Sequence, residues 1–255
     1  MMVTKSTNLW DYISFPSIEE RSNMSKIEEI GEIQITPDEF GYTGLTNLEE
    51  TNPELADYIR LYNNKVVEVS ISYAMAIHYF NKRIPDSPFK PSQNRIADIN
   101  EPNNNGNFGD RFWFGYYSDV FLIQIQTLWD IVLYMINCHY MYSLKQDQRM
   151  EKKLLELLKK DHPLLFQKID SIWKQQLYQR IRGYRVKSTH LTSSINVKYS
   201  ILRVCFDGKV VARLYGPGEY EKPSTIVKDM EDYISLVKKS VHELLILIKK
   251  EAPHA

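Results

Sequence analysis

The chain has 255 residues, 43% of them hydrophobic, which is enough to bury the core of one large domain. Its 32 Lys and Arg balance its 32 Asp and Glu, and this neutrality excludes the indiscriminate coating of nucleic acid that strongly basic proteins perform. Two cysteines make no disulfide framework, and residues 1–8 have no secretory pattern. The most apolar window, residues 120–135, is too short to span a bilayer, so we expect a soluble cytoplasmic protein.

The first 50 residues are acidic and show little periodicity. Residues 1–61 hold twelve acids and only four bases. Such a block is typical of a solvated face, or of an arm that lies against a basic site of the same or another protomer. A short strand is indicated at residues 32–36, before Pro37. We therefore expect residues 1–50 to form a weakly ordered acidic arm ahead of one helical domain over residues 51–255.

Three long segments have the periodicity of amphipathic helices. Asn52 supplies a cap and Pro53 a first residue for a helix that should reach about residue 83. A second helix is predicted over about residues 110–145, and a last one from Ser224 onward. Residues 84–109 connect the first two as a proline-rich loop, of a length that is usually functional or disordered.

A further helix and a hairpin are predicted between the second and last of these segments. The helix should begin at Pro163 and break near Gly183. The pair Asp207-Gly208, between two apolar runs, indicates a β-hairpin over residues 194–215. The predicted fold is therefore all-α, an antiparallel four-helix bundle with a small β-hairpin inserted before the last helix.

Residues 173–206 are the stretch with the strongest charge bias. They include seven Lys and Arg and no Asp or Glu, and their centre reads Arg180-Ile-Arg-Gly-Tyr-Arg-Val-Lys-Ser-Thr-His190. Guanidinium groups fit phosphate oxygens in a bidentate way, and imidazole transfers protons near neutral pH. These residue types together indicate chemistry on a phosphodiester.

The pair Arg185 and His190, preceded by Tyr184, resembles the motif of the HEPN superfamily (higher eukaryotes and prokaryotes nucleotide-binding domain). Members carry an Arg, four to six residues and a His near the start of a helix, often after an aromatic residue. The segment 114–134 is similar to the long second helix of these domains, and the likeness extends over about residues 52–250.

Two positions depart from the family pattern. Val186 stands directly after the Arg, where the family prefers a polar residue. Thr192 stands where members with nucleotide-transfer antitoxins have a Tyr. The first departure puts catalytic competence in question, and the second does not favour that form of regulation.

The resemblance implies metal-independent cleavage of RNA at a homodimer interface, in toxin–antitoxin or antiviral defence. The implied partners are a second copy of the chain, RNA or a nucleotide, and a cognate antitoxin, with no membrane, metal or other cofactor. The implied site comprises catalytic Arg185 and His190, RNA-contacting Arg180, Arg182, Tyr184 and Lys187, and a supporting Asp130. Positions five apart on a helix point about 140° apart, so Arg185 and His190 converge only where the helix begins or unwinds between them.

Each of these residues also has a plainer interpretation. His190 would be a satisfied, partly buried histidine, and Arg185 would pair with an acid such as Asp130. Arg182 and Lys187 would be solvated charges, and Tyr184 a core residue. Two further functions stay open: a catalytically idle HEPN-like domain that binds a nucleotide or RNA, which Val186 favours, and a helical protein–protein module whose basic stretch docks an acidic partner.

Overall fold

The computed structural model describes residues 13–86, 108–147, 149–190, 199–206, 209–217 and 221–251, and for residues 108, 187–190, 199–206 and 209–217 it describes the backbone alone. Its body consists of helices, which confirms the all-α class. The elements in chain order are α1 (Ile18–Ser22), α2 (Ile27–Gly31), the 3-10 helix η2 (Pro37–Phe40), α3 (Gly44–Thr51), α4 (Pro53–Phe80), α5 (Phe108–His139), α6 (Met150–Asp161), α7 (Pro163–Trp173), α8 (Gln176–His190), β1 (Tyr199–Phe206), β2 (Lys209–Pro217) and α9 (Pro223–Glu251).

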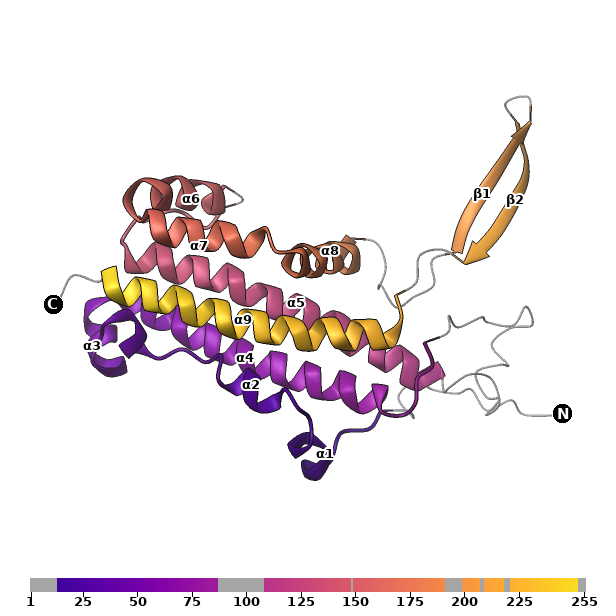
Figure 1. Ribbon diagram of the computed structural model, residues 1–255, viewed down its shortest axis with the longest axis horizontal. Helices are drawn as coiled ribbons and strands as arrows, with labels where there is room; N and C mark the ends of the chain where they lie inside the picture. Colours follow the sequence, from indigo (N-terminus) through magenta and orange to yellow (C-terminus); the bar gives the residue numbers. More distant parts are fainter. Residues whose placement is uncertain are drawn as a thin grey trace.

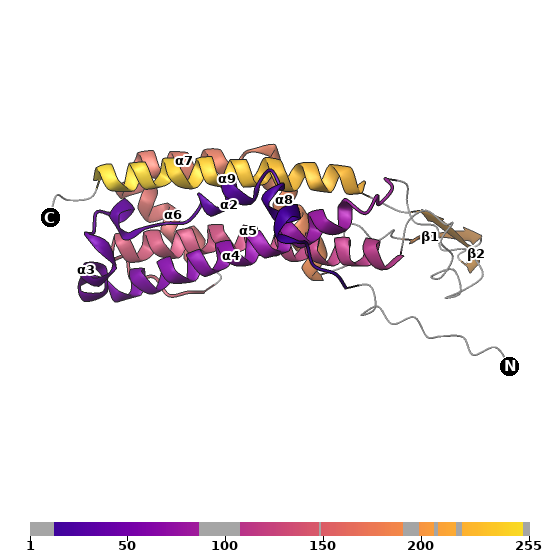
Figure 2. The same cartoon turned by 90° about the horizontal axis from the view of Figure 1, so that it is seen from below.

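The long helices lie side by side along the molecule (Figure 1). In the view turned by 90°, α4 and α5 form one layer, and α7 and α9 form the other (Figure 2). Leu, Ile, Val and aromatic side chains from both layers fill the space between them in a continuous buried core. This packing follows from the apolar stripes of the helices, since each stripe must be covered by a neighbour.

The predicted start of the first long helix is confirmed in atomic detail. The Asn52 side-chain oxygen accepts a hydrogen bond from the backbone N–H of Leu55 at 3.1 Å, and Pro53 is the first helical residue. The Asn52 amide also donates to the backbone carbonyl of Cys138 at 3.1 Å, which joins the start of α4 to the end of α5. The helix ends at Phe80, three residues before the predicted end.

The predicted helix from Pro163 to Gly183 is wrong in its internal continuity and in its end. It is interrupted after Trp173, where α7 ends, and the Gln179 side chain donates to the freed Trp173 carbonyl. Helix α8 then passes through Gly183 without a break. Glycine costs about 1 kcal/mol in a helix, and burial of Tyr178, Ile181 and Tyr184 on either side of it outweighs that cost.

The expectation of a weakly ordered arm is corrected for the described residues 13–50. This segment folds into short helices, and Ile30, Phe40 and Leu48 are at most 2% exposed within the common core. Its acids pair with α4 and α9, through contacts that include Glu32 with Lys238, rather than with the basic stretch of α8.

The strand predicted at residues 32–36 is replaced by a turn at residues 32–33 and an irregular segment at residues 34–36, which pairs with neither of the described strands. Ile33 and Ile35 are still buried, as the alternating pattern requires. The Asn63 side chain on α4 accepts from the Ile35 N–H at 2.9 Å and donates to the Ile35 carbonyl at 2.8 Å. One amide side chain thus supplies the hydrogen bonds that a neighbouring strand would have made.

Strands β1 and β2 pair antiparallel with Tyr199 opposite Pro217 and Phe206 opposite Lys209. They lie beside the end of the helical body at which α9 begins (Figure 1). The turn predicted at Asp207-Gly208 and most of the predicted loop 84–109 lie outside the described residues.

Helix α5 is long and apolar enough to cross a membrane, with a mean hydropathy of 1.4 over its most apolar window within Gly109–His139. Of that window, 61% is buried inside the protein. Phe114, Phe121, Ile125, Leu128 and Ile136 are not exposed at all. An apolar composition of this kind is also that of a core helix, because neighbours cover several of its faces.

His139, the last residue of α5, packs its ring on Phe40 with the ring centroids 5.4 Å apart. Its Nδ1 atom is buried and makes no hydrogen bond within the part of the chain that the structure describes. Burial, with a smaller contribution from His162, lowers the pKa of His139 from 6.5 to about 4. His139 is therefore neutral in the folded chain over most of the acidic range.

We expect Asn52→Ala to lower the free energy of unfolding by about 2 kcal/mol, because the change removes both the cap of α4 and its link to α5. Urea denaturation measures the loss. The matched control is Asn64→Ala, at an exposed position of the same helix, which should change stability by no more than about 0.5 kcal/mol. Equal effects of the two changes would contradict the structural role of Asn52.

We also expect His139 to make the protein less stable in acid. The unfolded chain takes up a proton below pH 6.5 that the folded chain takes up only near pH 4, so stability falls as the pH falls between these values, by on the order of 2–3 kcal/mol. Urea denaturation on both sides of this window measures the effect. His139→Phe keeps the ring contact and should flatten the pH dependence; an unchanged dependence would contradict the assignment.

Candidate functional site

The basic stretch enters the structure as α8, which packs on α5 and α9. Tyr178, Ile181 and Tyr184 form its buried face, with exposed fractions of 3%, 0% and 3%. Of the seven cations of the stretch, Arg180, Arg182, Arg185 and Lys187 lie on this helix, Lys174 lies just before it and Arg203 lies on β1. Three of them have acidic partners: Lys174 pairs with Asp170, Arg180 with Asp229 and Arg185 with Asp130.

Arg185 is fixed by the acid that the sequence suggested. Its Nη1 atom donates to Asp130 Oδ2 on α5 at 3.0 Å. The two side chains are 33% and 38% exposed, so the pair lies at the surface of the helical body and stabilises the fold by no more than about 1 kcal/mol. Its main effect is geometric, because Asp130 sets the direction in which the guanidinium group extends.

Tyr184 lies in the core, and its hydroxyl joins two helices. It donates to Asp229 Oδ2 on α9 at 3.2 Å and accepts from Arg180 Nε at 3.1 Å. Burial, only partly offset by the Arg180 hydrogen bond, raises the pKa of Tyr184 to about 12. In this conformation the ring has no open face on which a base could stack. The predicted contact of Tyr184 with RNA would therefore require the ring to move, and it stays a prediction.

Arg180 completes the same cluster from the surface. Its Nε lies 2.9 Å from Asp229 Oδ2, and its Nη2 lies 3.6 Å from Glu221. Desolvation of the Asp229 carboxyl, which is 8% exposed, raises its pKa above the ordinary value, although Arg180 and Tyr184 oppose this shift. The cluster therefore holds the middle of α8 against the first turns of α9.

Sequence reasoning missed Asp229 and Glu221. Asp229 falls on the apolar stripe of α9, next to the buried Met230 and three residues after the buried Ile226. A carboxylate within such a stripe is the signal that could have found it, since a buried charge needs a partner. The identity of that partner could not be read from the sequence, because Tyr184 is 45 residues away.

A second buried polar chain connects α5, α8 and α9. The Gln126 side chain donates to the Tyr178 hydroxyl at 3.1 Å and accepts from the Tyr233 hydroxyl at 2.8 Å. All three side chains are buried, and each hydrogen bond joins different helices. Because a slip of α8 would leave these groups unpaired, the chain fixes where α8 lies on α5.

The remaining predicted site residues also lie on α8, Arg182 near its middle and Lys187 and His190 in its last turn. Arg182 is exposed and makes no ion pair within the described part of the chain. Lys187 and His190 occupy the last turn and the last position of the helix, and their side chains are outside the description. Val186, between the two predicted catalytic positions, is 52% exposed.

The backbone between Arg185 and His190 is helical throughout, so the helix neither begins nor unwinds between them, as convergence of the two residues would require. The two positions are therefore separated by about 140° around the axis of α8. Arg185 lies beside α5, and His190 ends the helix at the edge of the described segment. Among the described residues, no three His, Cys, Asp or Glu side chains are close enough to hold a metal ion.

The helical body and the position of α8 against the long apolar helix α5 are compatible with the HEPN class of domains. Residues 58–249 match the Cthe2314-like HEPN family, and the chain belongs to that family. Membership indicates a fold of the nucleotide-binding or ribonuclease-like kind. Neither the curated proteins nor the solved structures include a match.

We expect Tyr184→Phe to lower the free energy of unfolding by about 1–2 kcal/mol, because the buried Asp229 carboxylate loses a hydrogen-bond donor while the ring is kept. Urea denaturation measures this loss. Tyr116→Phe, at a ring that is 51% exposed, is the matched control and should change stability by less than about 0.5 kcal/mol. If Tyr184 served only to stack on RNA, its hydroxyl could be removed with no loss of stability.

Proposed function

We propose that this chain is a metal-independent endoribonuclease that acts as a homodimer, with Arg185 and His190 as its catalytic residues. The observation that carries the proposal is the direction of the Arg185 guanidinium group, which Asp130 of α5 holds by an ion pair. Arg185 lies on α8, the helix that ends in His190. Family membership supports the assignment of a ribonuclease-like fold. In this proposal α4, α5, α7 with α8, and α9 correspond to the four helices of the HEPN bundle, and β1–β2 to the insertion before its last helix.

The chemistry needs three contributions. The 2′-hydroxyl of the RNA must lose a proton, the leaving 5′-oxygen must gain one, and the added charge on phosphorus must be stabilised. A histidine can act as base or as acid, and a guanidinium group can hold two phosphate oxygens. No metal takes part in this scheme.

A second protomer resolves the geometric difficulty of the continuous helix. The positions of Arg185 and His190 in one chain are about 140° apart around the axis of α8, so the two residues do not meet easily on one phosphate. A two-fold axis near the end of α8 brings two histidines and two arginines together, and one histidine then serves as base while the other serves as acid. The dimer, the RNA substrate, an antitoxin partner, a role in defence and a cytoplasmic location all belong to this proposal.

Arg182 and Lys187 would contact the RNA backbone on either side of the cleaved phosphate. The exposure of Arg182 supports this role, whereas Arg180 is engaged with Asp229 and Glu221 and its part in binding depends on release of those acids. Exposed Val186 in place of a polar residue favours the second candidate, a domain that binds RNA or a nucleotide without cleaving it.

We expect purified protein to cleave total RNA in the presence of EDTA and His190→Ala to slow this cleavage by roughly 100-fold or more, because the variant lacks the proton-transfer group. The matched control is His242→Ala, at an exposed histidine on α9, which should cleave like the parent protein. Gel electrophoresis of RNA fragments and light scattering, with a mass of twice 30.0 kDa expected, provide the readouts.

Cleavage that EDTA abolishes, or that His190→Ala leaves unchanged, would contradict the proposed mechanism. Binding of RNA without cleavage by the parent protein, with equal affinity in the His190→Ala variant, would instead establish the catalytically idle domain.

A further inference from the structure

A serine, a histidine and a glutamate meet where the segment before α2 crosses α4, away from α8. Ser14 Oγ lies 2.9 Å from His78 Nε2, and His78 Nδ1 lies 3.2 Å from Glu20 Oε1. The two ring nitrogens of His78 thus face a hydroxyl on one side and a carboxylate on the other. Ser14 and His78 are 64 residues apart, so no spacing in the sequence pointed to this group.

The contacts around His78 include the direction of hydrogen bonding that nucleophilic attack by serine needs. Lys82 Nζ donates to Ser14 Oγ at 2.6 Å, which directs the hydroxyl hydrogen of Ser14 toward His78 Nε2. His78 then carries its proton on Nδ1 and donates to Glu20. A hydrogen bond from the Ser17 backbone is the main cause that lowers the pKa of Glu20, so this carboxylate is charged at neutral pH.

The backbone at Ser14 is fixed as well. The Tyr79 hydroxyl accepts from the Ser14 N–H at 2.9 Å and donates to the Ser14 carbonyl at 3.1 Å. His78 is 8% exposed and its ring packs edge-on against Tyr79. Ser14 itself is only half-buried, so a small molecule can approach its hydroxyl. Anchored groups with one accessible oxygen are what nucleophilic catalysis requires.

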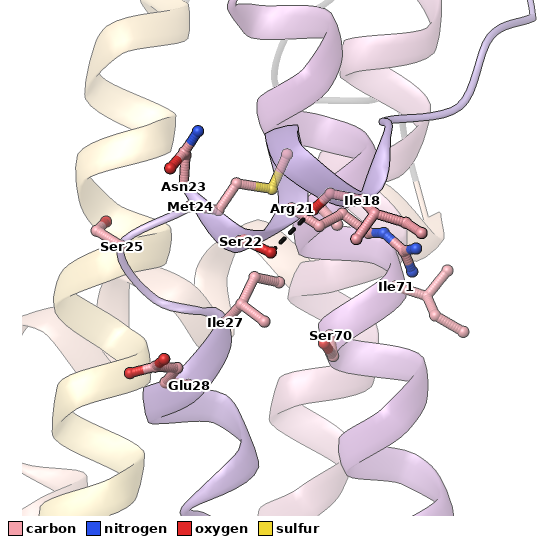
Figure 3. Close-up of a pocket in the computed structure, with 11 residues that line it drawn as sticks. Ile18, Arg21, Ser22, Asn23, Met24, Ser25, Ile27, Glu28, Ser70 and Ile71 are labelled. Carbon is pink, nitrogen blue, oxygen red and sulfur yellow. Dashed lines mark hydrogen bonds between the residues drawn. The ribbon is translucent and has the colours of Figure 1, made fainter.

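A cavity of about 480 Å³ lies between the same two elements. On one side it is lined by Ile18 and Arg21, which flank Glu20 in α1, and on the other by Ile71 and Ala74 of α4 (Figure 3). Ala74 precedes His78 by one helical turn, so both residues lie on the same face of α4. The volume is that of a site for a small ligand, but six of its eleven lining residues are polar or charged and none of Ser14, Glu20 and His78 is among them, so the cavity lies beside this group and is not part of it.

We propose that Ser14, His78 and Glu20 form a second active site, which hydrolyses carboxylic esters of small molecules that reach the half-buried Ser14 hydroxyl. Ser14 Oγ attacks the ester carbonyl carbon and His78 Nε2 takes the hydroxyl proton. The carbon–oxygen bond to the alcohol breaks, and His78 returns the proton to the leaving alkoxide. Water then attacks the acyl-serine, His78 passes a proton from the water to Ser14 Oγ, and the acid leaves.

Glu20 and Lys82 have separate roles in this site. Glu20 holds the His78 ring in its tautomer and stabilises the imidazolium that forms. The Lys82 ammonium group, already in contact with Ser14 Oγ, faces the negative charge that develops on the carbonyl oxygen. The site shares no residue with α8 and does not depend on the proposed ribonuclease activity.

A fluorescent fluorophosphonate, which forms a bond between its phosphorus and a nucleophilic serine oxygen with loss of fluoride, tests the proposal on the full-length protein. We expect labelling of Ser14, located by peptide mass spectrometry, and no labelling of Ser14→Ala. The Glu20→Gln change at an exposed position keeps a hydrogen-bond acceptor and should slow labelling roughly 10-fold, and His78→Gln should slow it roughly 100-fold or more. Ser171→Ala, at an exposed serine on α7, should label like the parent protein.

Circular dichroism of each variant separates loss of chemistry from loss of fold, and Glu20→Gln decides if His78→Gln does not fold. The proposal is overturned if the folded parent protein is not labelled at Ser14, or if labelling proceeds at the same rate in Glu20→Gln. In the first case the contacts of Ser14 serve only to anchor residues 13–22, and Ser14→Ala would then increase proteolysis of that segment without any change in labelling.

Discussion

The packing of α4 against α5 is the constraint on which the rest of the structure depends. The two helices are tied near both ends: the Asn52 amide donates to the Cys138 carbonyl, and the buried Arg111 guanidinium group donates to the Pro85 carbonyl at 2.9 Å. Fixed in this way, they form a platform whose remaining faces are covered by α8, α9 and the short helices before α4. The apolar character of α5 follows from this position, because neighbours cover several of its faces.

Helix α8 acquires its position from this platform through polar contacts. Gln126 on α5 bridges Tyr178 on α8 and Tyr233 on α9, and Asp229 on α9 accepts from Tyr184. Buried polar groups are costly unless each is satisfied, so they allow one placement of α8 where a purely apolar contact would allow several. The direction of Arg185 is a consequence of that placement, since Asp130 lies only one turn after Gln126 on α5.

Periodicity predicted the long helices well, because α4 and α9 each bury one continuous stripe along their length. It failed where local preference and tertiary burial disagree. Gly183 favours a break, but the buried residues around it keep α8 intact, and the real interruption after Trp173 carries no glycine or proline. Residues 13–50 show weak periodicity because their buried side chains come from turns and short helices, so their share of the core was not visible in the sequence.

The predicted site shows that the number of cations in a stretch of sequence does not give the positive charge that is exposed on the protein surface. The sequence correctly proposed Asp130 as a partner of Arg185, because a carboxylate among apolar residues needs a cation. It overestimated the cationic surface, because Lys174, Arg180 and Arg185 lie beside acids from α7, α5 and α9 that are distant in the chain or outside the stretch. An acid-free run in the sequence therefore specifies which charges α8 can offer to neighbouring helices. Among the side chains of α8 that the structure describes, exposed Arg182 remains to attract a phosphate backbone.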